Sequence, residues 1–336
     1  MKNKLIVAGA LLATSLLPAL AGAADVPSAA RPGTVNYVEG RATINEQALD
    51  EKSIGTTELR PGQALRTETG KAEVLLTPGT FVRLGEMSSM TMISPSLTNT
   101  QVRLDEGRAI VEVDEIHSQN NLQMIENGIT TFLVKNGLYE FDADRQTVSV
   151  FDGQAVVQEG DRQIKLKGGH EFALSASKPA KAFKFDKKTA EDDDLYRWAS
   201  LRSSYVAEAN TDAARTYVVG GPSWFGEGWY WDPWFASYTF IPGDGIFYSP
   251  FGWGFYSPGF VYAAPFYYRA GYYRRFGPNY HAWGPGGHYG PPLRGARGGV
   301  RYGSRPGFGG GHATGGFGAT HAGGFRGGAS MGGMHR

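Results

Sequence analysis

The sequence predicts a mainly β protein: an antiparallel β domain, then one helix, an aromatic-rich irregular segment and a disordered Gly/Arg-rich tail. Three observations lead to this fold class. Apolar and polar residues alternate from about residue 34, as they do in half-buried strands. Turn signals recur every eight to twelve residues, which favours a sandwich or barrel over alternating strands and helices. Beyond Asp244 no acidic residue occurs, and glycine, aromatic residues and arginine dominate.

The first 23 residues have the order of a cleavable signal peptide. Lys2 and Lys4 precede an apolar run from Leu5 to Leu20, and small residues follow it up to Ala23. This run of 16 residues is shorter than the roughly 20 that span a bilayer. We therefore expect cleavage after Ala23 and a periplasmic, secreted or envelope location, with no transmembrane span in the mature chain. The alternative is an uncleaved N-terminal anchor.

The charge of the chain is divided between two regions. The formal net charge is +1, and residues 245–336 contribute nine arginines without a lysine or an acid. Removing these nine charges from the total leaves −8 for residues 1–244, so the sequence describes an acidic body with a cationic tail. The chain has no cysteine, which excludes a disulfide scaffold and a lipid-modified cysteine.

The β domain is expected over residues 31–180. Alternating apolar residues flank the Pro78-Gly79 turn, and further turns fall at Asp152-Gly153 and at residues 159–161. Residues 102–174 have the pattern of a ladder of short β-hairpins. Roughly 150 residues bury about two thirds of the surface of the unfolded chain, which is enough for stability without disulfides.

Several strings within residues 33–175 resemble the FecR domain of bacterial envelope proteins. They are GTVNYVEGRATI, the stretch TGKAEVLLTPGTFVRLG, VRLDEGRAIVEV, FLVKNGLYEF and VSVFDGQAVV, in that order. The resemblance implies a jelly-roll-like β-sandwich in the periplasm. The chain departs from the family pattern at residues 136–139, Asn-Gly-Leu-Tyr. Well-known members are transmembrane regulators of a sigma factor, but this sequence shows neither an internal membrane helix nor a cytoplasmic segment. Only the recognition role is therefore expected to apply.

One helix is expected over residues 189–214. Thr189 and Asp192 have the spacing of a capping box, and the acidic residues 191–194 favour a helix N-terminus. We interpret these acids as capping charges; a divalent-cation site is the alternative. An apolar face that docks on the sandwich or on the aromatic segment is predicted from Leu195, Trp198, Leu201 and Tyr205.

The aromatic segment is expected over residues 221–289. It contains 26 aromatic residues between Trp224 and Tyr289, six of them tryptophan. The rings either stack on a glycan or another envelope polymer, or pack against one another and the sandwich. We favour packing, because so many rings cannot all contact a ligand. The candidate stacking residues are Trp229, Trp231, Trp234, Trp253 and Tyr256.

The tail, residues 290–336, has 18 glycines and should be disordered, because it has too few apolar residues to offset its ordering entropy. Its arginines predict contact with anionic lipid or lipopolysaccharide, and export argues against nucleic acid. The candidate contacts, which begin upstream of the tail, are Arg269, Arg274, Arg275, Arg294, Arg297 and Arg301. Widely spaced histidines could recruit Zn²⁺ or Ni²⁺ only weakly, so no metal site or cofactor is predicted; they are His281, His288, His312, His321 and His335. His117 and His170 are expected to be ordinary turn or surface histidines.

The sequence predicts a protein that is not an enzyme. It lacks cysteine, a G-x-S-x-G elbow, an H-E-x-x-H motif and a phosphate loop, and Asp142 and Asp144 fall at an expected turn. We expect an exported binding or sensing module that recognises an envelope protein or polysaccharide. A structural protein that self-associates through its aromatic and Gly-rich half is the alternative. A third possibility is a regulatory partner of a separate membrane protein.

Overall fold

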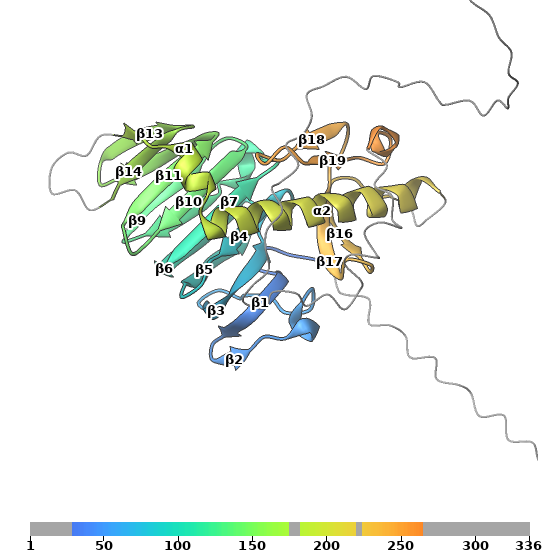
Figure 1. Ribbon diagram of the computed structural model, residues 1–336, viewed down its shortest axis with the longest axis horizontal. Helices are drawn as coiled ribbons and strands as arrows, with labels where there is room; N and C mark the ends of the chain where they lie inside the picture. Colours follow the sequence, from blue (N-terminus) through green and yellow to red (C-terminus); the bar gives the residue numbers. More distant parts are fainter. Residues whose placement is uncertain (1–28, 175–181, 220–223, 265–336) are drawn as a thin grey trace, which may run out of the picture. The chain divides into compact units, whose positions relative to one another are not determined.

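The structure is a computed structural model that describes residues 29–174, 182–219 and 224–264. It confirms a mainly β protein with one long helix after the large sheet in the described part of the chain (Figure 1). The predicted signal peptide and the predicted disordered tail lie outside the described residues. No helix in the described ranges is long and apolar enough to cross a membrane.

The β domain is one 15-stranded sheet. Its strands are β1 (Val35–Ile44), β2 (Gln47–Ala48), β3 (Ala64–Leu75), β4 (Thr80–Leu84), β5 (Ser89–Ser96), β6 (Asn99–Glu106), β7 (Arg108–Val113), β8 (Gln123–Glu126), β9 (Ile129–Leu133), β10 (Gly137–Asp142), β11 (Thr147–Asp152), β12 (Gln154–Glu159), β13 (Arg162–Lys167), β14 (His170–Ala173) and β15 (Phe183–Lys184). Short 3-10 turns lie at Glu51–Ser53 and Ser118–Asn120. Within the described residues, strands β1 to β14 fall inside the predicted range 31–180, and β15 lies just beyond it.

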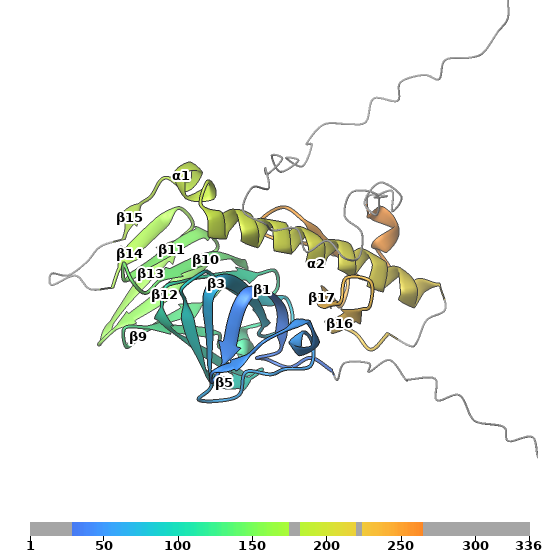
Figure 2. The ribbon, with the colours of Figure 1, turned by 60° about the horizontal axis from the view of Figure 1, so that its bottom comes forward.

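The strand order divides this sheet into two halves around one core. One half runs β13-β12-β9-β8-β6-β5 and the other runs β4-β7-β10-β11-β14-β15, while the long β3 pairs with both β5 and β4. Both halves contribute to a single apolar cluster that includes Met124, Val111, Phe141 and Val157. Among the described strands, every pairing is antiparallel except that of β6 with β8. The sheet therefore folds over itself as a sandwich (Figure 2).

The predicted ladder of hairpins is correct only in part. β10 pairs with β11 and β12 pairs with β13, as a ladder requires. In contrast, β6 does not pair with β7, nor β11 with β12: in each case the chain crosses from one half of the sheet to the other. Gly107 (φ +71°) and Gly153 (φ +90°) occupy these two crossings. A Cβ on Gly153 would lie 2.4 Å from Tyr139 Oη, so the crossing requires glycine.

The helical region differs from the single helix predicted over residues 189–214. A short helix, α1 (Lys187–Glu191), is followed by a long helix, α2 (Asp194–Val218). Asp186 and Asp193 cap them, so Thr189 is not a cap and the predicted capping box does not form. The Asp193 side chain accepts a hydrogen bond from the Leu195 amide at 2.9 Å, and this satisfies an N–H that would otherwise lack a partner.

Helix α2 covers the outer face of the second half of the sheet (Figures 1 and 2). Leu195 and Trp198 are buried there, as predicted. Leu201 and Tyr205 are only half-buried. Instead, the buried face of the helix includes polar side chains, namely Arg202, Ser203, Asn210 and Thr211. Of these, Arg202 and Ser203 donate hydrogen bonds to Glu73 and Glu112 on the sheet.

A network of buried charges joins α2 to the sheet. Arg83 on β4 donates to Glu73 at 2.8 Å and to Glu112, and neither the arginine nor the glutamates are exposed. Arg202 on α2 donates to Glu73 at 3.0 Å. Burial by itself raises the pKa of Glu73, but Arg202 and Arg83 outweigh it and hold this pKa at about 2. The network therefore fixes α2 on a polar region of the sheet.

The described part of the aromatic segment contains two antiparallel hairpins. These are β16 (Gly228–Asp232) with β17 (Ser237–Ile241), and β18 (Ile246–Tyr248) with β19 (Gly254–Tyr256); a 3-10 turn follows at Val261–Ala263. Asn210 on α2 donates to the carbonyls of Phe240 and Tyr256 at 2.8 and 3.0 Å. The hairpins therefore pack beside α2 and, with it, cover the sheet.

Candidate binding cleft

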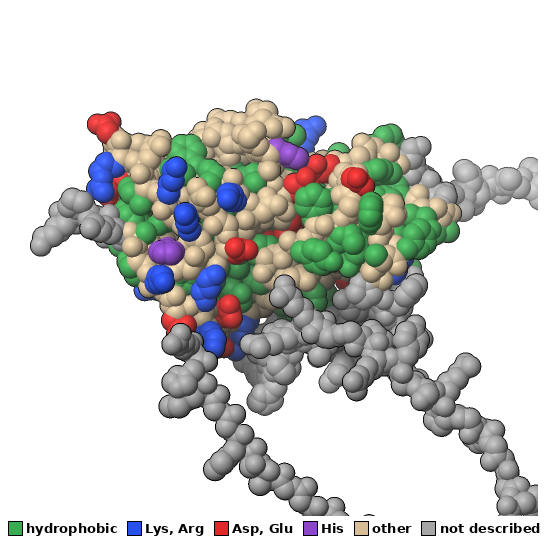
Figure 3. Space-filling model, turned by 90° about the horizontal axis from the view of Figure 1, so that it is seen from above, with side chains coloured by type: hydrophobic (Ala, Val, Ile, Leu, Met, Phe, Trp, Pro, Cys, Tyr) green, Lys and Arg blue, Asp and Glu red, His purple; other side chains and the backbone are tan. Residues whose placement is uncertain are grey.

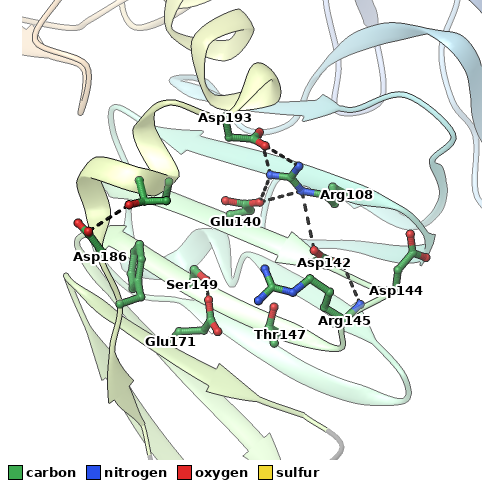
Figure 4. A pocket seen from close by; sticks show the side chains of 13 residues that line it. Arg108, Glu140, Asp142, Asp144, Arg145, Thr147, Ser149, Glu171, Asp186 and Asp193 are labelled. Carbon is green, nitrogen blue, oxygen red and sulfur yellow. Dashed lines mark hydrogen bonds and ion pairs between the residues drawn. The ribbon is translucent and has the colours of Figure 1, made fainter.

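The outer face of the sheet is open where α2 does not cover it. A cleft of about 610 Å³ lies there between strands β7, β10, β11 and β14 and the short helix α1 (Figure 4). Its lining residues are Arg108, Glu140, Asp142, Asp144, Arg145, Thr147, Ser149, Glu171, Phe185, Asp186, Thr189, Ala190 and Asp193. This is the candidate functional site, called the acidic cleft below.

The alternation of the strands brings the floor of the acidic cleft together. Glu140 on β10 and Glu171 on β14 both lie opposite Ser149 on β11. In the next outward-facing row, Asp142 lies opposite both Arg108 and Thr147. Residues two apart on a strand point to the same side, so these polar side chains share one face. The intervening Phe141 points into the core.

Arg108 is the best-anchored side chain of the cleft. Its guanidinium donates to both carboxylate oxygens of Asp193 at 2.9 Å and to Glu140, with a distance of 3.0 Å from Nε (Figure 4). Burial alone would lower the pKa of Arg108, but its bonds to Asp193 and Glu140 raise it, so the group stays charged. Arg108 thereby joins the sheet to the start of α2 at the upper wall of the cleft.

The turn after β10 supplies the opposite wall. Asp144 accepts a hydrogen bond from the Gly107 amide at 3.1 Å, and Asp142 accepts one from the Arg145 amide at 2.8 Å. The Arg145 side chain extends back over β11 into the cleft (Figure 4). Its guanidinium makes no ion pair within the described residues. The turn that was predicted from Asp142 and Asp144 thus forms one wall of the cleft.

The acidic cleft carries an excess of negative charge. Six of its lining residues are carboxylates and two are arginines. Burial raises the pKa of Glu140, whereas Arg108 opposes that shift. For Asp193, burial also acts to raise the pKa, but the hydrogen bonds and charge of Arg108 lower it overall. The cleft therefore has fixed acceptors and a negative potential, which suit a cationic ligand.

The candidate stacking residues do not gather on one exposed surface. Trp229 packs edge-on against Phe81 with ring centroids 5.0 Å apart, and Trp231 packs against Tyr238 at 5.2 Å. Tyr256 is 6% exposed, and Trp253 is partly buried against the same cluster as Phe81. Trp234 is the exception, with 66% exposure. Most of these rings thus occupy the layer between the hairpins and the sheet.

The candidate arginine contacts, from Arg269 to Arg301, lie outside the described residues, so contact of the tail with anionic surfaces stays a prediction.

Sequence reasoning did not identify the acidic cleft. Its residues belong to four strands, the turn after β10, and α1 with the caps of both helices, and most of them look like ordinary polar surface residues. The alternation of Glu140 and Asp142 gives the strand face, but only the strand order shows that Arg108 and Glu171 share it.

Comparison with known proteins gives limited similarity. No protein-family profile matches the chain, and no curated protein matches it. Two crystal structures of a proposed anti-sigma factor from Parabacteroides distasonis ATCC 8503, at 1.65 and 2.50 Å resolution, are similar to part of it. Both have 16% sequence identity and a TM-score of 0.31, and the matches cover 41% and 45% of this chain. The chain spans 63% of the length of the first and 72% of the second.

Proposed function

We propose that this protein is an exported, non-catalytic recognition module that binds a basic segment of an envelope protein in the acidic cleft. The observation that carries the proposal is the excess of six carboxylates over two arginines in an open cleft of about 610 Å³. Such a volume accommodates a few side chains of a partner. Lysine and arginine side chains present the donors that these carboxylates accept.

Two features of the sequence support this proposal. The first 23 residues have the order of a signal peptide, which would direct the chain to the envelope, where protein partners and polysaccharides are both present. The resemblance of residues 33–175 to FecR domains implies a role in recognising another protein. The cleft favours a protein segment over a neutral polysaccharide, because Phe185 is the only aromatic residue among its lining residues.

A pull-down from native envelope fractions tests the proposal. Mature wild-type protein is compared with the variant Glu171→Lys, which places a cation on the cleft floor. Glu171 is half-buried and accepts a hydrogen bond from the Ser149 hydroxyl at 2.7 Å, so the substitution leaves the core intact. We expect the wild type to retain a specific protein in a salt-sensitive manner. The variant should retain at least about tenfold less of that protein, which corresponds to about 1.4 kcal/mol of binding free energy.

The matched control is Asp161→Lys, which makes the same charge change in the exposed turn between β12 and β13. It should retain the partner as the wild type does. Equal retention by Glu171→Lys and the wild type would overturn the proposed cleft. A capture that fell equally in both variants would show an effect of net charge alone and would also contradict it.

The second candidate function is self-association. It is favoured by exposed rings in residues 224–264, which contain the two hairpins and are called the C-terminal layer below. Phe225, Trp234, Tyr248 and Tyr262 are 89%, 66%, 65% and 70% exposed. Hydrophobic side chains gather toward one end of the face shown in Figure 3. Exposed apolar groups of this kind mark interaction surfaces.

Sedimentation velocity over a range of concentrations distinguishes the two candidates. A recognition module should sediment as a monomer at all concentrations. An assembly protein should form larger species as the concentration rises, and the double variant Trp234→Ser/Tyr248→Ser should shift that assembly to higher concentration. A protein that stays monomeric at every concentration would exclude self-association through these rings.

A further inference from the structure

Glu115 and His117 lie on an anchored loop after β7. The Asp114 amide donates to the Gly79 carbonyl at 2.7 Å, and Asn136 donates to the Asp114 carbonyl at 2.7 Å. The His117 amide donates to the Asn120 side chain at 2.8 Å. These bonds hold the loop on both sides of Glu115.

Glu227 reaches the same place from a distant part of the chain. It immediately precedes β16, and its two carboxylate oxygens lie 3.1 and 3.2 Å from His117 Nε2, a contact between residues 110 positions apart. Glu115 Oε1 lies 3.7 Å from the same nitrogen. β16 is itself fixed, because Trp229 packs on Phe81. Two rigid elements therefore present the three side chains to one another.

The arrangement has the geometry of a ligand set. One atom from each side chain lies within 4.8 Å of the other two. Donors bound to one ion at about 2.1 Å in tetrahedral geometry are separated by about 3.4 Å. Glu115 Oε2 is shielded from solvent and has no hydrogen-bond partner within the described residues. Two carboxylates this close repel each other unless a cation or proton lies between them.

We propose that Glu115, His117 and Glu227 form a binding site for a first-row divalent cation, with Zn²⁺ as the probe. An imidazole with two carboxylates suits Zn²⁺ or a neighbouring transition metal, whereas Ca²⁺ and Mg²⁺ prefer oxygen ligands alone. Three protein ligands leave a coordination position for water.

The site would link the C-terminal layer to the β domain. Glu115 and His117 lie on the loop after β7 in the β domain, and Glu227 immediately precedes the first hairpin of the C-terminal layer. An ion bound by all three would stabilise the docked position of that hairpin, because it binds the folded state and not the unfolded one. This role is independent of the acidic cleft.

Zn²⁺ titration of the metal-stripped, full-length mature protein tests the site by calorimetry and by thermal unfolding. The variants are His117→Ala and Glu227→Gln, whose side chains are 41% and 26% exposed and therefore tolerate substitution. We expect Zn²⁺ to raise the Tm of the wild type. Each variant should bind Zn²⁺ at this site at least about tenfold more weakly.

His170→Ala is the matched control, because His170 is also a histidine near the surface of the β domain and does not belong to the cluster. It should keep the full Zn²⁺-dependent rise in Tm, and any binding by tail histidines is common to all four proteins. An equal rise in the wild type and in His117→Ala would overturn the site. So would variants that lower Tm in chelator while Zn²⁺ has no effect on the wild type, since His117 and Glu227 would then form only an ion pair.

Discussion

Replacing Arg83 with methionine is expected to lower the free energy of unfolding by about 3–5 kcal/mol. Arg83 is fully buried and bonds to both Glu73 and Glu112. Methionine fills a similar volume but carries no positive charge, so Arg83 no longer balances the buried carboxylates of Glu73 and Glu112. Burial and Glu112 raise the pKa of the nearby Asp114, which favours its protonated form and adds no further charge. Urea unfolding at neutral pH measures the loss.

Arg41→Met is the control for this prediction. Arg41 pairs with Glu68 at 3.1 Å, but its side chain is 73% exposed, so its loss should cost less than about 1 kcal/mol. Adding Glu112→Gln to Arg83→Met should recover part of the stability, since Glu112 then carries no charge and Glu73 keeps Arg202 as its partner. A loss below about 1 kcal/mol in Arg83→Met would contradict the importance of the network.

Acid should weaken the same network. Although burial raises it, the pKa of Glu73 is lowered overall, from 4.5 to about 2, by Arg202 and Arg83. A group whose folded pKa is depressed contributes stability above its unfolded pKa and loses that contribution as the pH falls toward the folded value. The contribution of Glu73 is therefore complete above about pH 4.5 and is lost toward pH 2.

Glu126 should make the protein less stable in alkaline solution. The residue is 2% exposed, and neither carboxylate oxygen has a partner among the described residues. Burial, with a smaller contribution from Asp142, raises its pKa from 4.5 to about 8. The unfolded state releases the proton first, so stability falls as the pH rises from about 4.5 to 8 and then stays constant.

Glu126→Gln removes this titration. Relative to the wild type, we expect the variant to gain about 2–4 kcal/mol of stability on going from pH 5 to pH 9. Urea unfolding at both pH values measures the change. Glu46→Gln, at an exposed turn position, should show no such gain. If the difference between Glu126→Gln and the wild type were the same at pH 5 and pH 9, Glu126 would not titrate in this window.

Sequence periodicity located the strands well, because a half-buried strand must alternate whatever its neighbours are. The Pro78-Gly79 turn joins β3 and β4 as a hairpin, as predicted. The turns at Gly107 and Gly153 have equally strong signals, yet they carry the chain across the sandwich. A turn residue reveals the local backbone conformation and does not reveal which strand lies beside the next one.

The helix shows the same division. Leu195 and Trp198 were identifiable as buried because they are apolar and helically spaced. Arg202 was not identifiable, since its burial depends on Glu73, 129 residues away in the sequence. The long helix begins at Asp194 and not at the predicted residue 189. Asp193 caps α2 and also accepts hydrogen bonds from Arg108 on the sheet.

The sequence by itself determined the mainly β class and the presence of a long helix after the large sheet, because these depend on local periodicity and turn chemistry. The tertiary structure decided the pairing of the strands, the buried charge network, the acidic cleft and the cluster of Glu115, His117 and Glu227. Each of these joins polar residues from separate elements. A polar side chain looks solvent-exposed in the sequence, and only the packing of distant segments determines whether it meets water or another charge.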